Sequence, residues 1–293
     1  MSWDIFVDVV LDSVIDVLKM MPIMLAACFL ADFIIARRKS VKAVNSLKGV
    51  ITGALLGIIP QCGISTGFAQ LYATGLVGLS VLMSVLIAGA DEALIFAAGG
   101  GQFLLVGQII LTKIISGISI GALIYFVQKW RRVRSEQRKN SDEVVVSGYC
   151  GHGHEHGHAH EHTSSVKDIL LHSVRNTLTI TFYVFVSVLL INLIVQWVGF
   201  DAVEAAFAHT GPFQPVLAAV IGLIPSCAVS IFLTETYMSG FITFGALIAG
   251  LSSNTGYGIV VLFKTLPLKK ALRLTALLVG VSIIIGEILY FVL

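Results

Sequence analysis

The sequence has few charged residues, and over long stretches it has none. Only 12% of its 293 residues are Asp, Glu, Lys or Arg, whereas a soluble domain contains about 25%. The runs 49–90, 176–200 and 236–263 contain no charged residue, and about 20 apolar residues suffice for a helix to cross a bilayer. These runs exclude a soluble globular domain and predict an all-α integral membrane protein.

Cysteines are few, and nucleotide-binding and leader signals are missing. The four cysteines are Cys28, Cys62, Cys150 and Cys227; two of them lie in a repeated motif, which makes a disulfide framework the weaker interpretation. No GxxxxGK[ST] loop is present, so we expect no direct use of ATP. The start, MSWDIFVDVV, has acids where a cleavable signal has positive residues. The net charge of +2 gives no reason to expect a nucleic acid partner.

An internal repeat organises the chain. Residues 57–75 and 222–240 are related by an offset of 165 and are identical at seven positions, where chance would give about one or two. The identical pairs are Gly57/Gly222, Ile59/Ile224, Pro60/Pro225, Cys62/Cys227, Ser65/Ser230, Tyr72/Tyr237 and Gly75/Gly240. We interpret this as a duplication of nearly the whole chain. It predicts a first transmembrane repeat at 1–128, a polar linker at 129–168 and a second transmembrane repeat at 169–293.

The distribution of basic residues predicts that the two repeats have opposite orientations. Five Lys or Arg residues lie between 37 and 48, whereas the equivalent loop at 200–215 has none. The loop at 99–103 has none, whereas its equivalent carries Lys264, Lys269 and Lys270. Because basic residues mark the cytoplasmic side, we expect inverted-topology repeats with both termini outside and the linker in the cytoplasm. Inversion requires an odd number of crossings per repeat, and three and five both fit.

Each repeat contains a proline inside an apolar segment, at Pro60 and Pro225. Proline removes a helical hydrogen bond and disfavours helix at the residue before it, so we expect broken or re-entrant helices at the repeat centres. Two such breaks at equivalent places of an inverted repeat indicate a binding site at the membrane midplane. The alternative is that both prolines are packing kinks. The candidate binding residues around the breaks are Gln61, Cys62 and Ser65 in the first half and Ser226, Cys227 and Ser230 in the second.

Acidic and amide side chains lie within the apolar sequence. Asp91 and Glu92 form an acidic pair, and Glu235 lies in the second broken segment opposite Gln70. A match of residues 87–89 with 248–250 sets Asn254 near the level of the acidic pair. Acids within a membrane are costly and by default functional, although the pair could also lie in water at the end of a span. Thiolates prefer soft metals and carboxylates prefer harder ions such as Mn²⁺, and this core offers both.

Two further features concern cations. Six histidines alternate with small or acidic residues in the linker: His152, His154, His156, His158, His160 and His162. Imidazole binds Zn, Cu, Ni or Co better than Mn, so we expect a metal-binding tract, with a solvated segment of incidental affinity as the alternative. Lys113 lies within the apolar run 102–128, where it could extend to the membrane surface or pair with Asp91 or Glu92.

Short motifs of the sequence resemble a family of bacterial permeases described as ten-transmembrane heavy-metal exporters. They are IPQCG, LYATG, ADEAL, IPSCA and ETYMSG, together with the histidine-bearing middle loop. Members of that family are also labelled manganese transporters or arsenic-efflux-like permeases. The resemblance covers essentially the whole chain and implies ten spans, a cytoplasmic (inner) membrane location and efflux of a metal or metalloid. The positions that carry it are Pro60, Gln61, Cys62, Asp91, Glu92, Pro225, Ser226 and Cys227.

Together these features predict a secondary-active transporter, not an enzyme, that exports a divalent heavy-metal ion, with Mn²⁺ favoured. The expected metal ligands in the core are Cys62, Asp91, Glu92, Cys227 and Glu235. A metalloid or organoarsenical permease is the alternative within transport, and an intramembrane thiol redox enzyme is the alternative from another class. We expect no permanently bound cofactor; the metal ion is cargo and could also bind the histidine tract. The expected partners are lipid, the metal ion and a coupling proton, and a homodimer stays open.

Overall fold

The computed structural model describes residues 44–60, 62–89, 92–136, 207 and 211–292, with isolated positions among 11–26 and 174–189. Four helical stretches in this part are long and apolar enough to cross a membrane. They are Leu79–Gly99, Phe103–Arg131, Phe244–Thr265 and Leu268–Val292. The described part is helical apart from an isolated β-bridge between Val44 and Val77. The chain is therefore a multi-pass helical membrane protein. The predicted first spans of both repeats and most of the linker lie outside the described residues.

The first half begins with a helical hairpin. Helix α2 (Leu47–Gly57) starts at Ser46, whose hydroxyl accepts a hydrogen bond from the amide of Gly49 at 3.1 Å. The chain turns at 58–61 and returns as α3 (Cys62–Ala73). The two ends of the hairpin meet where Val44 N donates to Leu76 O at 2.8 Å and Gly78 N donates to Val44 O at 3.1 Å. The chain therefore enters and leaves the hairpin on the same side of the molecule.

After the hairpin, the chain crosses once through a broken span and returns through a long helix. The broken span consists of α4 (Leu79–Ala88) and α5 (Ala93–Gly99), and α6 (Phe103–Glu136) follows. Every residue of α4 from Ser80 to Ala88 is buried, whereas α6 exposes large apolar side chains such as Leu104, Leu111 and Leu123. A helix that is apolar all round belongs in an interior, so α4 lies at the centre and α6 faces lipid.

The second half has the same order of elements. A 3₁₀ turn (Gly211–Phe213) leads into the hairpin of α9 (Gln214–Gly222) and α10 (Cys227–Met238). The broken span of α11 (Phe244–Ser253) and α12 (Gly258–Thr265) follows, and then α13 (Leu268–Val292). The starts of α10, α11, α12 and α13 each lie 165 residues after the starts of α3, α4, α5 and α6. The offset found in the central motif therefore holds for the starts of these four helices as well.

Two of the repeated glycines have the same structural role. Gly75 and Gly240 end α3 and α10 with positive φ angles of 76° and 81°. In both cases the next residue donates back to a carbonyl five residues earlier, Leu76 to Leu71 and Phe241 to Thr236, each at 3.0 Å. This left-handed ending is open to glycine at little cost, which explains why glycine occurs at both positions.

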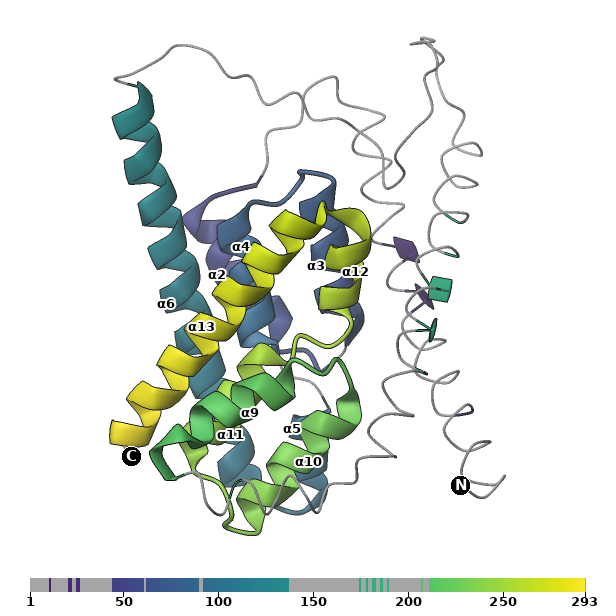
Figure 1. Cartoon of the computed structure of the whole chain (residues 1–293), viewed down its shortest axis with the longest axis vertical. Coiled ribbons are helices and arrows are strands. Elements are labelled where there is room, and N and C mark those ends of the chain that lie inside the picture. Colours follow the sequence, from purple (N-terminus) through teal and green to yellow (C-terminus); the bar gives the residue numbers. More distant parts are fainter. Residues whose placement is uncertain are drawn as a thin grey trace.

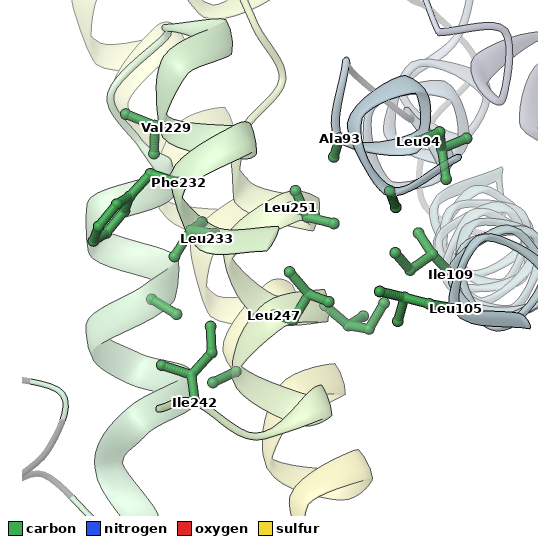
Figure 2. Close-up of a cluster of buried hydrophobic side chains, with 14 of the residues drawn as sticks. Ala93, Leu94, Leu105, Ile109, Val229, Phe232, Leu233, Ile242, Leu247 and Leu251 are labelled. Atoms are coloured by element: carbon green, nitrogen blue, oxygen red, sulfur yellow. The ribbon is translucent and has the colours of Figure 1, made fainter. Parts of the chain in front are cut away.

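The two halves of the chain pack against each other, and each of the two large buried clusters contains residues of both halves. One buried apolar cluster joins α3 and α4 to α12 and α13, and a second joins α5 and α6 to α10 and α11. Figure 2 shows the second cluster, with Leu94 and Ile109 of the first half facing Leu247 and Leu251 of the second. In Figure 1, α12 lies beside α3, and α6 ends at the top of the view whereas α13 ends at the bottom. Equivalent long helices thus run in opposite directions.

Candidate functional site

Both proline motifs lie at the tips of the helical hairpins. Pro60 falls in the turn between α2 and α3, and Pro225 falls in the turn between α9 and α10. The last residue before each turn is a glycine packed against the neighbouring broken span. A Cβ on Gly57 would lie 2.7 Å from the carbonyl oxygen of Val85, and one on Gly222 would overlap the carbonyl of Gly250. Each hairpin tip therefore reaches the point where the broken span of its own half is interrupted.

The second interruption is organised by Asn254. Its side-chain amide donates to the hydroxyl of Ser230 at 2.7 Å and to the carbonyl oxygen of Ser226 at 3.2 Å. Its side-chain oxygen accepts from the amide of Gly256 at 3.0 Å. Asn254 is 1% exposed and Ser230 is 0% exposed. Three residues predicted from the sequence, Ser226, Ser230 and Asn254, thus form one buried polar group at the tip of the second hairpin.

The first half also reaches this place. Helix α3 packs on α12, and a Cβ on Gly258 would lie 3.2 Å from the carbonyl oxygen of Ser65. Gly258 is the first residue of α12 and follows directly after the interruption at 254–257. Ser65 is itself 8% exposed. A fourth predicted residue therefore lies beside the second interruption, contributed by the other half of the chain.

Lys113 connects the two interruptions. This residue of α6 is 0% exposed, and its ammonium donates to the carbonyl oxygen of Gly89, at the end of α4, and to that of Leu251, in the last turn of α11, at 2.9 Å. The last carbonyls of a helix lack partners within the helix and carry partial negative charge. A buried positive charge therefore lies between the ends of the two central helices.

Some buried polar atoms have no hydrogen-bond partner among the described residues. Among them are the hydroxyl oxygens of Ser252 and Thr255 near the second interruption and, farther along α3, the side-chain oxygen and nitrogen of Gln70. An unpaired buried polar group costs about 1–3 kcal/mol, and such groups are rare in folded proteins. Ser252 lies just before the interruption that Asn254 organises and Thr255 lies within it, so their oxygens are candidate ligands for a polar or charged substrate.

Other predicted residues lie farther away. Glu235 of α10 is exposed and Gln70 of α3 is fully buried; each lies eight residues beyond the start of its helix, which corresponds to about 12 Å. The structure therefore does not bring Glu235 or Gln70 to the hairpin tips. Glu92 is half-buried at the first interruption and precedes α5.

The remaining predicted residues lie wholly or in part outside the part of the chain that the structure describes. Cys62 and Cys227 begin α3 and α10, but their side chains are not among the described atoms. Gln61, Asp91 and the linker histidines His152, His154, His156, His158, His160 and His162 also lie outside the described residues. Within the described part, no group of three or more His, Cys, Asp or Glu residues is placed to hold a metal ion.

Two central residues were not identified as binding candidates from the sequence. Lys113 is predicted to reach water or to pair with Asp91 or Glu92; its ammonium also donates to two backbone carbonyls, which the sequence does not indicate, and Asp91 lies outside the described residues. Thr255 had no signal beyond its position after Asn254. A strict offset of 165, which the helix starts follow, places residues 254–257 opposite the interruption at 89–92. Thr255 could have been found from the sequence in this way.

A family of known proteins matches the second half of the chain. Residues 144–293 match the ArsP_2 family, described as "Putative, 10TM heavy-metal exporter". Neither a curated protein nor a solved structure matches the chain. The matched range covers just over half of the 293 residues and includes α9 to α13, and the described helices have the length and composition of a multi-pass membrane protein. The chain therefore belongs to this family of ten-transmembrane heavy-metal exporters.

Proposed function

We propose that the chain is a secondary-active transporter, without covalent chemistry of its own, that exports a divalent heavy-metal cation from a site where the two halves meet. The observation that carries this proposal is the buried polar group at the second interruption. Hydrogen bonds between Asn254, Ser226 and Ser230 hold the backbone of this interruption in place. The hydroxyls of Ser252 and Thr255 lie beside these residues and have no partner among the described residues. Non-helical backbone at membrane depth is tolerated where it lines a cavity or is buried in protein, and such interruptions bind substrates in transporters.

The chemistry of the described residues favours Mn²⁺ among transition metals. The hydroxyl, amide and carbonyl oxygens at residues 252–255 are hard ligands, which suit Mn²⁺ better than softer ions. Asp91 and Glu92 would add carboxylate oxygens from the first interruption, since Glu92 lies directly before α5. In this proposal the acids also serve as carriers of the coupling proton.

We further propose that the halves are inverted-topology repeats with re-entrant hairpins in a bacterial cytoplasmic membrane. The offset of 165 between the starts of four pairs of helices and the opposite directions of α6 and α13 (Figure 1) support this arrangement. Helices α2 and α3 have 11 and 12 residues, which span about half of a bilayer. The hairpin tips would then lie near the midplane, with both termini outside and the histidine tract in the cytoplasm.

Expression in a metal-sensitive bacterial host tests the proposal. Cells that carry the wild-type chain should contain less Mn than cells with an empty vector after the same exposure, and should grow at higher Mn concentrations. The total cell content of Mn, Fe, Co, Ni, Cu and Zn should be measured together, because this identifies the cargo without prior choice. Unchanged content of every one of these metals would contradict the proposal.

A second candidate, a metalloid permease, is favoured by the cysteines that begin α3 and α10 at equivalent positions. Thiolates bind soft centres such as trivalent arsenic more readily than oxygen ligands do. Replacing Cys62 and Cys227 together by serine separates the two candidates. If the wild type does not lower the Mn content of the cells and the double variant loses arsenical resistance, the metalloid is favoured. If the wild type exports Mn and the double variant retains that export, the result agrees with oxygen ligation.

A further inference from the structure

The two large buried apolar clusters contain equivalent positions taken from opposite halves of the chain. The first cluster includes residues of α3, α4, α12 and α13, and the second includes residues of α10, α11, α5 and α6. Positions related by the offset of 165 occur in both, among them Leu82/Leu247, Leu86/Leu251 and Leu94/Ile259. Each cluster therefore joins the first part of one broken span to the second part of the other.

The two clusters lie on opposite sides of the interruptions. Helix α4 leads to the first interruption and α12 leads away from the second, and both contribute to the first cluster. In Figure 1, α3, α4 and α12 lie in the upper part of the view, and α5, α10 and α11 lie in the lower part. The end of α6, with the exposed Lys129, and the start of α13, with the exposed Lys269, are at the top. The first cluster thus lies between the interruptions and the side with these lysines, here called the basic face.

The clusters differ in polarity next to the interruptions. Members of the first cluster that have polar counterparts at the offset of 165 are Ile87, Tyr257 and Leu278, whose counterparts are Ser252, Glu92 and Lys113. Ser252 and Lys113 are 0% exposed, so the difference concerns the interior and not the surface. Polar side chains therefore border the interruptions on the side of the second cluster, and apolar side chains close them toward the basic face.

Tyr257 connects the second interruption to the first cluster. It is the last residue before α12 and has the largest of the fully buried side chains among the described residues, at 1% exposed. It belongs to the same cluster as Leu86 and Ile87, which lie near the end of α4 in the other half. A buried aromatic side chain removes about 150–250 Å² from solvent. Displacement of the second interruption would withdraw this ring and loosen the packing between the two halves.

We propose that the first cluster, with Tyr257, is the barrier between the interruptions and the basic face, and that the second cluster is the equivalent barrier toward the opposite face. Both barriers are packed in this structure. Because packed interfaces switch between discrete arrangements, loosening one cluster while the other stays packed would expose the interruptions to one face at a time. The proposal rests on the proposed function in one respect, namely that a substrate has to reach the interruptions.

Sided thiol labelling tests the barriers without any metal. The full chain carries the reporter Thr255→Cys within the second interruption, and membrane vesicles of both orientations are treated with a membrane-impermeant methanethiosulfonate. Peptide mass spectrometry measures modification at position 255 separately from the native cysteines. Lys269→Cys, at an exposed position, identifies the preparation that presents the basic face. Adding Tyr257→Ala should raise the labelling rate of Thr255→Cys from the basic face by about tenfold or more, whereas Tyr257→Phe, which keeps the ring, should behave like the parent.

Leu86→Ala and Leu251→Ala form the matched pair for this test. The two leucines are equivalent by the offset of 165, are each 2% exposed, and belong to the first and the second cluster respectively. Leu86→Ala should speed labelling of Thr255→Cys from the basic face, and Leu251→Ala should speed it from the opposite face. Faster labelling of both variants from the same face, or of each variant equally from both faces, would overturn the proposal, because it would indicate general loosening of the core.

The remaining outcomes are also decisive. Labelling of the parent reporter that is fast from the basic face would show that the first cluster is no barrier. If Tyr257→Ala fails to accumulate in the membrane, the leucine pair decides alone by the same criterion. Absence of metal export by the wild type would count against the proposed function, whereas the sided labelling reports on the clusters whether or not a metal is carried.

Discussion

Replacing Thr255 by valine should stabilise the protein and impair transport at the same time. The Thr255 side chain is 3% exposed and its hydroxyl is unpaired among the described residues. Valine has nearly the same shape and lacks the hydroxyl. Because an unpaired buried hydroxyl costs about 1–3 kcal/mol, the variant should unfold at a temperature higher by roughly 2–6 °C. If the hydroxyl oxygen is a ligand of the cation, its loss should weaken apparent metal affinity by about tenfold to a hundredfold.

Thr236→Val is the matched control for this prediction. Thr236 is likewise buried, at 1% exposed, but its hydroxyl donates to the carbonyl oxygen of Phe232 at 2.7 Å, near the far end of α10. The same substitution there should lower stability by about 0.5–1.5 kcal/mol and leave metal affinity unchanged. Unfolding temperature and concentration-dependent Mn uptake into inverted vesicles measure both quantities. A Thr255→Val variant with wild-type affinity would refute a binding role for this hydroxyl, whatever its stability.

Two further predictions concern packing and the linker. Gly222→Ala should destabilise the protein by about 1–3 kcal/mol or prevent its accumulation, because a Cβ would overlap the backbone of Gly250; Gly280→Ala, with no atom within 4 Å of its Cβ, should be neutral or slightly stabilising. Expression level and unfolding temperature of the two variants check this prediction. Equal values for Gly222→Ala and Gly280→Ala would contradict the close contact between Gly222 and Gly250. Replacing the six histidines at 152–162 by serine should reduce Zn²⁺ or Ni²⁺ binding in equilibrium dialysis without abolishing export; complete loss of export would place the tract in the transport path.

Much of the fold could be predicted from the sequence because it depends on strong local signals. Absence of charge over long runs predicts membrane helices, and the described part has four spans of that kind. The turns at Pro60 and Pro225 occur where the proline rule places them. Positive φ at Gly75 and Gly240 explains two of the repeated identities. Each of these features is determined within a few residues.

The arrangement of the site could be predicted only in part, because it depends on contacts between distant segments. Asn254, Ser226 and Ser230 were chosen for residue type, and their hydrogen bonds arise from the way α10 meets the end of α11. The local match of residues 87–89 with 248–250 sets Asn254 near the acidic pair, whereas the helix starts keep the offset at 165 and place Asn254 opposite Gly89. Glu235 was selected as an acid in an apolar run, but the fold exposes it. Polarity within a run does not specify which face of the helix a residue occupies.

The differences between the halves are more informative about mechanism than their similarities. Equivalent positions hold Gly89 and Asn254 at the interruptions, and Lys113 and Leu278 in the outer helices. At the second interruption the Asn254 side chain hydrogen-bonds the backbone of Ser226 and Gly256, and the hydroxyls of Ser252 and Thr255 have no partner among the described residues. At the first, a glycine leaves its carbonyl to a lysine from another helix. A duplicated scaffold thus provides two interruptions at matching places, and the side chains beside them differ, so that hydroxyl oxygens are left as candidate ligands at the second.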